Sequence, residues 1–478
     1  MWSEPEFEVL TAAFAAIPSF RHGGYVTGCS SGLITASGLD RHAAIGDLCL
    51  IERREAATPS AASPLFRGQN AVMAEVVGFT EAGVKLVAYE EPVGITRGAK
   101  VALEPGLGIL YPCLAWRGRV LDALARPIDG GPPLPRGDRA YRITARAVAA
   151  ERRRGLGRRL SLGVRALDLF TPCCDGQRLG IFAGSGVGKS TLLSMIARDS
   201  DADALVVGLI GERGRELNDF LEHTLGAEGR ARSVVVVATS DLPAMLRRRA
   251  AYVALTVAEQ LRDQGLRVLC LMDSVTRFAM ALREIYLAAG EVPASRGYPP
   301  SVLAELPRLL ERAGPGEGEG SITGLFTVLV EGDDTNEPVS DTVRGILDGH
   351  IVLDRAIAEG GRFPAVDPLR SVSRSAPGCY TAEEWGLVRE ARRLMRLHAD
   401  MEELIRLGAY RSGSNAELDR AIAVRPALEA VLRQDASERA VAGSAAFASL
   451  AEALARPTEE RAAPSRSDAG ATNDDGER

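Results

Sequence analysis

The sequence predicts an α/β protein with an N-terminal β-barrel, a central domain built on a mostly parallel sheet, and a C-terminal helical domain. Three observations lead to this fold class. Short β-rich runs punctuated by glycines fill residues 24–103, apolar β-branched runs alternate with helical stretches from about 163 to 375, and a helical pattern follows Thr381. A chain of 478 residues also exceeds what one hydrophobic core normally serves, so we expect two or three domains.

Composition and charge are those of a globular chain. Apolar residues make up 46% of it, and the net charge is −6. Such a chain lacks the positive field that non-specific nucleic-acid binding uses, and we expect no sequence-specific nucleic-acid partner. Charged residues interrupt every long apolar stretch, and the N-terminus lacks the pattern of a signal peptide. We therefore expect a cytoplasmic protein.

The cysteines predict a reducing compartment. Their number is odd, and they are scattered without metal-ligand spacing. Cys173 and Cys174 form the close pair, and the sequence favours a pair of thiols over a disulfide or a zinc site. The cysteines are Cys29, Cys49, Cys113, Cys173, Cys174, Cys270 and Cys379.

The first two units are a short helix and the barrel. In residues 1–20, apolar side chains recur at helical spacing up to Pro18, which predicts an amphipathic helix that packs on its own domain or docks a partner. Residues 21–103 form the barrel domain, because short strands at this spacing indicate a small barrel or sandwich. A loop is expected at 58–64. The helix carries Phe7, Leu10, Phe14 and Ile17, and the predicted strands are 25–27, 33–35, 48–51, 71–77 and 84–87.

Residues 104–162 are expected to be a linker segment. Residues 126–133 are rich in proline and glycine, and five arginines crowd the run from Glu151 to Arg159. A solvated linker is the favoured reading of this basic run, and an anionic surface such as lipid is the alternative.

The central domain spans 163–378. Its continuous apolar strands imply a parallel sheet that is covered on both faces. Residues 379–456 form the C-terminal helical domain, and 457–478 have the composition of a disordered tail. The predicted central strands are 179–182, 205–210, 234–237, 268–272 and 324–330.

A phosphate-binding loop is the strongest functional signal. It follows a predicted strand and precedes a helix-forming run, so its backbone N–H groups and the helix N-terminus are expected to bind phosphates. Lys189 would neutralise phosphate charge, and Ser190 would ligate Mg²⁺. The first position is Ala183, where the strict pattern has glycine. The expected nucleotide-binding residues are Gly184, Ser185, Gly186, Val187, Gly188, Lys189, Ser190 and Thr191.

Two carboxylates are candidates for the rest of the chemistry. Asp273 ends the predicted strand 268–272, where an acid could hold the Mg²⁺-bound water; a helix cap is the alternative. Glu212 follows the strand 205–210 and is the candidate that orients the attacking water. Taken without context, Glu212 would be read as a surface charge beside two arginines.

Four linked motifs occur in an order that resembles the rotary ATP synthase and type III export ATPase superfamily. The resemblance runs from about residue 24 to 435 and implies a barrel, a RecA-like P-loop core and a helical C-terminal domain. The motifs are 184–190, Gly211-Glu212-Arg213, 273–277, and 364–374.

The resemblance also assigns roles to individual residues. Glu212 resembles the catalytic carboxylate that polarises water, with Arg213 beside it, and Asp273 resembles the Walker B residue. Arg374 resembles the arginine that reaches the γ-phosphate bound by the next subunit. Phe363 resembles the aromatic that stacks on adenine. Taken alone, Phe363 would be read as core and Arg374 as a surface charge.

Within the superfamily, residues 182–190, 332–338 and 346–355 look most like the flagellar export ATPase. This implies a Mg-ATP hydrolysing homohexamer that energises protein export through the type III secretion apparatus, peripheral to the inner membrane. Its implied partners are export-gate membrane proteins, a stalk or regulator protein and chaperone–substrate complexes. The alternatives are an injectisome ATPase, the catalytic beta-type subunit of a proton-translocating ATP synthase, an RNA translocase, and a non-catalytic nucleotide-binding scaffold.

Overall fold

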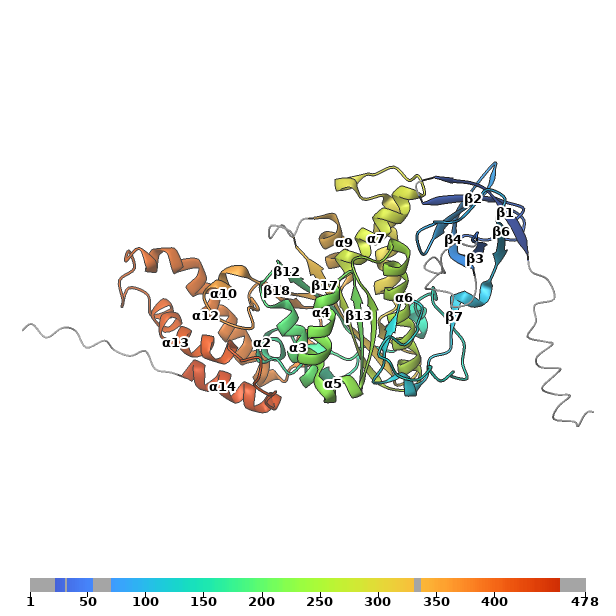
Figure 1. The fold of residues 1–478 in the computed structure, drawn as a ribbon. Coiled ribbons are helices and arrows are strands. Elements are labelled where there is room, and N and C mark those ends of the chain that lie inside the picture. The colour runs from blue at the N-terminus through green and yellow to red at the C-terminus, as the bar shows by residue number, and fades with distance from the viewer. Residues whose placement is uncertain (1–21, 31, 55–69, 331–336, 456–478) are drawn as a thin grey trace, which may run out of the picture.

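The computed structural model describes residues 22–30, 32–54, 70–330 and 337–455, and it confirms the predicted fold class. A barrel at one end, a central sheet flanked by helices and a helical body at the other end follow one another along the molecule (Figure 1). The predicted N-terminal helix, the loop at 58–64 and the tail at 457–478 lie outside the described residues.

The N-terminal strands close into an antiparallel barrel in the order β1-β2-β5-β4-β3-β6. All five strand runs expected from the sequence lie in it. Buried and partly buried side chains alternate along β2, and Ile34, Val72 and Leu86 fill the interior. The strands are β1 (Gly23–Ser30), β2 (Leu33–Ser37), β3 (Leu48–Glu52), β4 (Ala71–Thr80), β5 (Gly83–Ala88) and β6 (Lys100–Leu103).

The central sheet has the order β19-β18-β12-β17-β15-β13-β14-β8, and β16 pairs with β17. β18, β12, β17, β15, β13, β14 and β8 are parallel, whereas β19 and β16 are antiparallel to their neighbours. The strands are β8 (Val120–Asp122), β12 (Arg178–Ala183), β13 (Ala204–Ile210), β14 (Ser233–Ala238), β15 (Arg267–Asp273), β16 (Gly314–Pro315), β17 (Ser321–Leu329), β18 (Gly349–Leu353) and β19 (Val372–Ser373).

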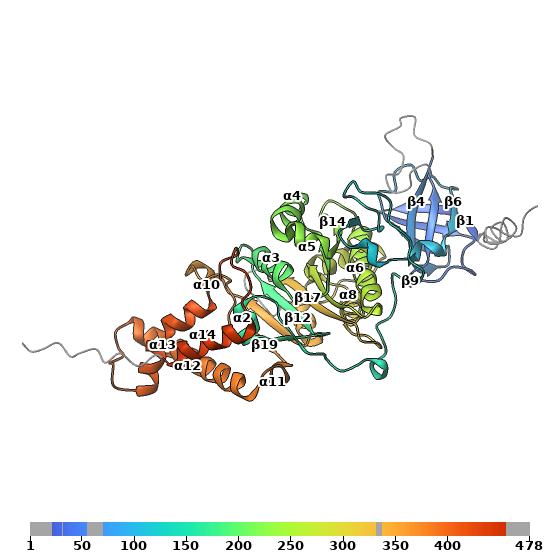
Figure 2. The ribbon, with the colours of Figure 1, turned by 90° about the horizontal axis from the view of Figure 1, so that it is seen from below.

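Both faces of this sheet are buried, as continuous apolar strands require. Val206 on β13 belongs to the core formed with α6, whereas its neighbours Leu205 and Val207 belong to the core formed with α3 and the C-terminal helices. Figure 2 shows the helices on either side of the sheet. The central helices are α2 (Arg165–Phe170), α3 (Lys189–Asp199), α4 (Gly214–Asp219), α5 (Gly226–Ala231), α6 (Ala244–Asp263), α7 (Val275–Ala288), α8 (Pro300–Leu310), α9 (Pro338–Ile346), α10 (Arg355–Glu359) and a π-helix at Phe220–Leu225.

The expected linker contributes to the core sheet. Its strand β8 pairs with β14 along the sheet edge. The basic run is attached to both neighbouring parts of the chain. Arg153 pairs with Glu311 of the central domain at 2.9 Å, and the Arg159 guanidinium lies 5.2 Å from the ring centre of Phe447 in the C-terminal body. The shorter elements here are β7 (Ile109–Leu110), β9 (Tyr141–Arg142), β10 (Arg159–Leu160), β11 (Cys173–Cys174) and 3₁₀ turns at Pro105–Gly108, Leu114–Trp116, Ala150–Arg152 and Ser295–Gly297.

The C-terminal body is a set of packed helices. Thr381 caps the first long helix through a reciprocal pair of hydrogen bonds with Glu384, which satisfies backbone N–H groups at the helix start. Buried Leu394 and Val424 join this body to the core around α2 and α3. The helices are α11 (Ala376–Cys379), α12 (Ala382–Arg406), α13 (Ala416–Leu432) and α14 (Gly443–Ala455).

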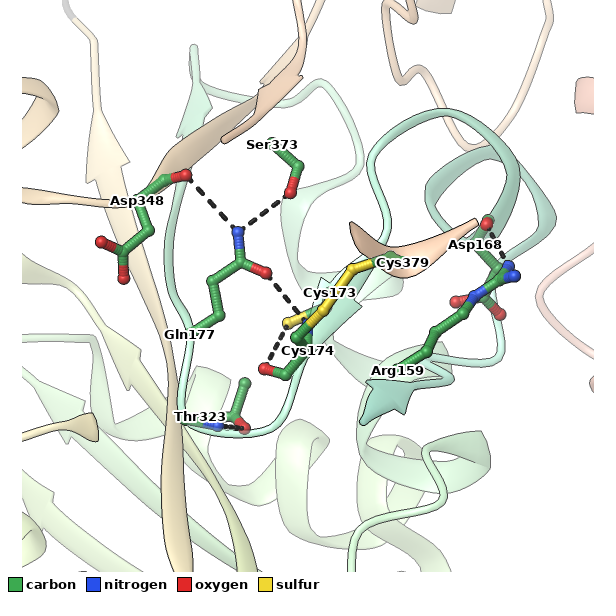
Figure 3. The surroundings of a disulfide bond; sticks show 10 residues. Arg159, Asp168, Cys173, Cys174, Gln177, Thr323, Asp348, Ser373 and Cys379 are labelled. Atoms are coloured by element: carbon green, nitrogen blue, oxygen red, sulfur yellow. Dashed lines mark hydrogen bonds between the residues drawn. A yellow bond between two sulfur atoms is a disulfide. The ribbon is translucent and has the colours of Figure 1, made fainter. Parts of the chain in front are cut away.

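A disulfide joins this body to the central domain. Cys174 on β11 is bonded to Cys379 on α11, 205 residues away (Figure 3). The prediction that Cys174 stays a thiol beside Cys173 is therefore wrong. Cys379 packs on β11 through the tertiary fold, so no local spacing in the sequence reveals the pair. None of the described helices is long and apolar enough to cross a membrane.

Candidate active site

The phosphate loop, residues 184–188, joins the end of β12 to the start of α3. Gly186 has φ 78° and Gly188 has φ 92°, and such positive values favour glycine because other side chains strain the backbone there. Gly188 is also the residue that caps α3. The loop therefore presents its amides and the positive end of a helix to one place, which suits an anion.

Lys189 opens α3 and contacts both candidate carboxylates. Its Nζ lies 2.6 Å from Oδ1 of Asp273 and 3.7 Å from Oε1 of Glu212. Ser190 and Thr191 follow in the first helical turn with exposed side chains. The structure thus brings the loop, the lysine and both acids together, although they come from separate parts of the chain.

Strand register explains this convergence. In the parallel ladder Leu209 is level with Asp273, so β13 and β15 end at the same edge of the sheet. Asp273 is only 6% exposed, and its Oδ1 accepts a hydrogen bond from the hydroxyl of Thr327 at 2.6 Å. Thr327 was not among the residues predicted from the sequence. Its one signal is a hydroxyl within the otherwise apolar strand 324–330.

Glu212 follows β13 and lies in a partly buried position. Burial, with a smaller contribution from the charge of Asp273, raises its pKa to about 7, while Lys189 opposes the shift. Its Oε1 has no hydrogen-bond partner within the described ranges. A carboxyl group with this surplus acceptor capacity can hold a water molecule.

The arginines near this site differ in how they are held. Arg213 is 77% exposed and lies 4.0 Å from Glu216. Arg277, which the sequence analysis did not single out, lines the same cavity, and its Nε is buried without a hydrogen-bond partner among the described residues. Its signal was its place four residues after Asp273. Arg277 therefore adds positive charge where an anion would sit.

One cavity of about 980 Å³ is lined by the phosphate loop together with Lys189, Ser190, Glu212 and Arg277. A second cavity of about 160 Å³ is lined by Ser190, Glu212 and Asp273, among others. A hydroxyl and a carboxylate at one cavity are the hard oxygen ligands that Mg²⁺ prefers, so the residues present fit that ion.

Phe363 lies against the phosphate loop. A Cβ placed on Gly188 would come within 3.6 Å of its ring, and Phe363 is 47% exposed. An exposed aromatic face beside a phosphate loop can stack on a base.

Arg374 lies near the amino ends of the parallel strands, opposite the carboxyl ends that carry the phosphate loop. Its backbone N–H donates to the carbonyl of Asp348 at 2.9 Å, and the Asp348 carboxylate accepts from the backbone N–H of Arg178 at 3.0 Å. Arg178 begins β12, whereas the phosphate loop follows its end. The length of β12 therefore separates the amino and carboxyl ends of the sheet by about 17 Å. Arg374 therefore lies too far away to contact the phosphate loop of its own chain.

Two stretches of the chain match known families. Residues 163–373 match the nucleotide-binding domain of the ATP synthase alpha/beta family, and residues 380–452 match the T3SS EscN ATPase C-terminal domain.

Several characterised proteins are similar over most of their length. The flagellum-specific ATP synthase of Caulobacter vibrioides is 56% identical over 78% of this chain and 85% of its own. That of Salmonella typhimurium is 44% identical over 90% of this chain and 93% of its own. The type 3 secretion system ATPase of Xanthomonas euvesicatoria is 46% identical over 79% of this chain and 82% of its own.

Solved structures of a type III secretion ATPase share the fold. The assembled ATPase EscN from enteropathogenic E. coli superposes with a TM-score of 0.81 at 39% identity, covering 90% of this chain and all of EscN. EscN in complex with its central stalk EscO gives a TM-score of 0.79 at 38% identity, with the same coverage.

Proposed function

The chain belongs to the ATP synthase alpha/beta family, among its flagellum-specific type III export ATPases, and on this premise we propose that it works as a homohexameric ring that energises flagellar protein export. It is an ATPase. The proposal concerns the ring, the residues that carry the chemistry, the metal and the export partners.

One observation carries the ring proposal: Arg374 and the phosphate loop lie at opposite edges of the same sheet. One chain therefore holds two halves of a site that it cannot join by itself. A closed ring of identical chains lets the Arg374 of one subunit face the phosphate loop of the next. An arginine supplied in this way stabilises the charge that develops on the transferring phosphoryl group.

Each residue of the phosphate site then has a defined task. Loop amides and Lys189 bind the β- and γ-phosphates, and Glu212 orients the water for in-line attack. The Lys189 ammonium group pairs with the Asp273 carboxylate. We infer that it exchanges this contact for phosphate oxygens when nucleotide binds. Arg277 adds charge to the same cavity, and Phe363 stacks on adenine.

Ser190 and Asp273 would hold Mg²⁺. When bound, this ion neutralises charge on the phosphate oxygens. Thr327 orients the Asp273 carboxylate through its hydroxyl, and Arg213 lies close enough to the cavity to contact nucleotide or a neighbouring subunit.

The proposed partners follow from the relatives. EscN was solved with its central stalk EscO, which supports a stalk-type partner for this chain. Export-gate membrane proteins and chaperone–substrate complexes complete the proposed set, with the ring in the cytoplasm at the inner membrane. An injectisome role is the second candidate, because the Xanthomonas euvesicatoria ATPase is 46% identical.

The test uses two variants that disable opposite halves of the site. We expect Glu212→Gln and Arg374→Ala each to abolish ATP hydrolysis. The specific activity of the wild type should rise with protein concentration, and added RNA should not change it. Mixing the two inactive variants should restore part of the activity, because a Glu212-bearing subunit then meets an Arg374-bearing neighbour.

Arg396→Ala serves as the control, since this exposed arginine on α12 pairs, among the described residues, with Asp400 of its own helix. It should leave the rate unchanged. If the mixture stays inactive while both variants still assemble, Arg374 does not act across an interface. Activity that requires RNA would indicate a translocase instead.

A further inference from the structure

The segment that carries Phe363 combines an exposed ring with buried neighbours. Phe363 is 47% exposed, whereas Arg362 is 6% exposed and Ala365 is 1% exposed. The ring is about half buried, so its own packing fixes its place beside the phosphate loop only in part, and the rest depends on how the backbone around it is held.

An ion pair from the C-terminal helices holds one side of this segment. The guanidinium of Arg362 donates to the carbonyls of Pro364 and Val366 at 3.2 and 2.9 Å, which folds the segment around it. Its Nε lies 2.8 Å from the carboxylate of Glu429 on α13. Glu429 also pairs with Arg425 one turn earlier, at 2.9 Å, which keeps the carboxylate in place.

Gln434, just after α13, holds the other side. Its backbone N–H donates to the carbonyl of Phe363 at 3.0 Å. Its side chain is buried and joins the start of the central domain: Oε1 accepts from the backbone N–H of Arg165 at 2.9 Å, and Nε2 donates to the carbonyl of Gly163 at 3.0 Å. Gln434 therefore links the C-terminal body, the central domain and the aromatic residue.

We propose that Glu429 and Gln434 are positioning residues for the ring of Phe363, so that the C-terminal helical domain sets how tightly the adenine base is held. The inference rests on the proposed function, because it takes Phe363 as the aromatic that stacks on adenine. It goes beyond that function by giving the C-terminal helices control over nucleotide affinity. The phosphate loop makes none of these contacts, so the control should act on the base and leave phosphate binding unchanged.

The test compares two ligands that share phosphates but differ in the base: Mg-ATP and Mg-tripolyphosphate, each titrated calorimetrically into the full-length chain. Phe363→Ala should weaken ATP binding about tenfold, since stacking on an aromatic is lost. Glu429→Ala, which removes the ion pair with Arg362, should weaken ATP binding about threefold, the size of one lost hydrogen bond. Gln434→Ala keeps the backbone N–H that donates to Phe363 but removes the two side-chain hydrogen bonds that hold Gln434 against Gly163 and Arg165, so we expect a similar loss of ATP affinity. Tripolyphosphate affinity should be unchanged in all three.

A matched control and a double variant separate positioning from general damage. Glu417 is an exposed acid on α13, the helix that also carries Glu429, and it pairs with Arg393. Glu417→Ala should leave the affinities for ATP and for tripolyphosphate unchanged. Phe363→Ala combined with Glu429→Ala should bind ATP as Phe363→Ala does, because a positioning residue has no effect once its ring is gone.

The results distinguish the two ideas. If Phe363→Ala is selective for ATP but Glu429→Ala and Gln434→Ala weaken both ligands equally, or neither ligand, the positioning inference is overturned and the adenine role of Phe363 stands. The positioning inference is also overturned if the losses of ATP affinity in Phe363→Ala and Glu429→Ala add up fully in the double variant. If Phe363→Ala itself fails to discriminate between the ligands, the adenine role falls, and the inference falls with it.

Discussion

Lys189 Nζ and Asp273 Oδ1 lie 2.6 Å apart, so the cation proposed to bind phosphate is paired with the carboxylate proposed to hold the metal. Both side chains are largely buried, at 12% and 9% exposure. Glu212 lies 3.7 Å from the same ammonium group, so one cation serves both acids.

Removing Lys189 should therefore cost stability as well as activity. We expect Lys189→Met to abolish hydrolysis and to lower the free energy of unfolding of the nucleotide-free chain by about 3 kcal/mol, because it leaves two acids without their cation. Urea unfolding measures this. The double variant Lys189→Met/Asp273→Asn should recover part of the loss; a Lys189→Met chain as stable as wild type would contradict the pairing.

Thr327 should affect how Asp273 holds Mg²⁺, although Thr327 itself is not proposed to contact the nucleotide. Thr327→Val keeps the side-chain shape but removes the hydroxyl that donates to Asp273. We expect kcat to fall about tenfold, the size of a hydrogen bond to a charged group, and half-maximal activity to need more Mg²⁺. Activity against Mg²⁺ concentration at saturating ATP is the measurement.

Thr323→Val is the matched control for that experiment, since Thr323 is buried on the same strand and its hydroxyl accepts from the backbone of Gly176 instead. It should leave the Mg²⁺ dependence unchanged, and Thr327→Ser should restore it. The same Mg²⁺ curve for Thr327→Val and wild type would exclude the role.

Asp129 should make stability depend on pH. Hydrogen bonds from the Arg119 guanidinium, and then from the backbone N–H groups of Val120 and Gly131, hold the pKa of this carboxyl well below its usual range. A depressed folded-state pKa contributes stability that is complete above the unfolded pKa, about 4, and is lost as pH falls toward the folded value.

Asp129→Asn should thus lower the free energy of unfolding by about 2 kcal/mol at pH 7, and the difference from wild type should shrink below about pH 4. Urea unfolding at several pH values measures it. A penalty that stays constant down to pH 3 would show that packing, and not ionisation, is responsible.

The Cys174–Cys379 bond should stabilise the oxidised chain. In non-reducing buffer, Cys379→Ser should lower the free energy of unfolding by about 5 kcal/mol, because the bond closes a long loop in the unfolded state. Cys173→Ser is the control, since this buried neighbour is a free thiol. Peptide mapping without reductant should recover residues 174 and 379 linked, and alkylation of both thiols would refute the bond.

Local order in the chain made much of the fold and of the candidate site predictable. The phosphate loop lies between a strand and a helix that are adjacent in sequence, so strand, loop and helix signals occur together. Asp273 and Glu212 each follow an apolar strand, and the carboxyl ends of parallel strands share an edge. The barrel strands likewise showed as short apolar runs between glycines.

Other residues had no such signal, because their contacts join distant segments. Thr327 reaches Asp273 only through the pairing of β17 with β15. Gln434 meets Phe363 only because the C-terminal helices pack on the central domain. Cys379 is bonded to Cys174, which lies 205 residues away in the sequence. The prediction of a thiol pair rested on Cys173, the direct neighbour of Cys174.

The amino-acid sequence by itself determined the three-part fold class, the phosphate loop and the acids that follow its neighbouring strands, because periodicity and turn chemistry are local properties. Only the tertiary structure decided that Lys189 pairs with Asp273, that Arg374 lies at the opposite edge of the sheet, and that the C-terminal helices hold Phe363. Strand order and domain packing set these distances, and neither is written in the spacing of neighbouring residues.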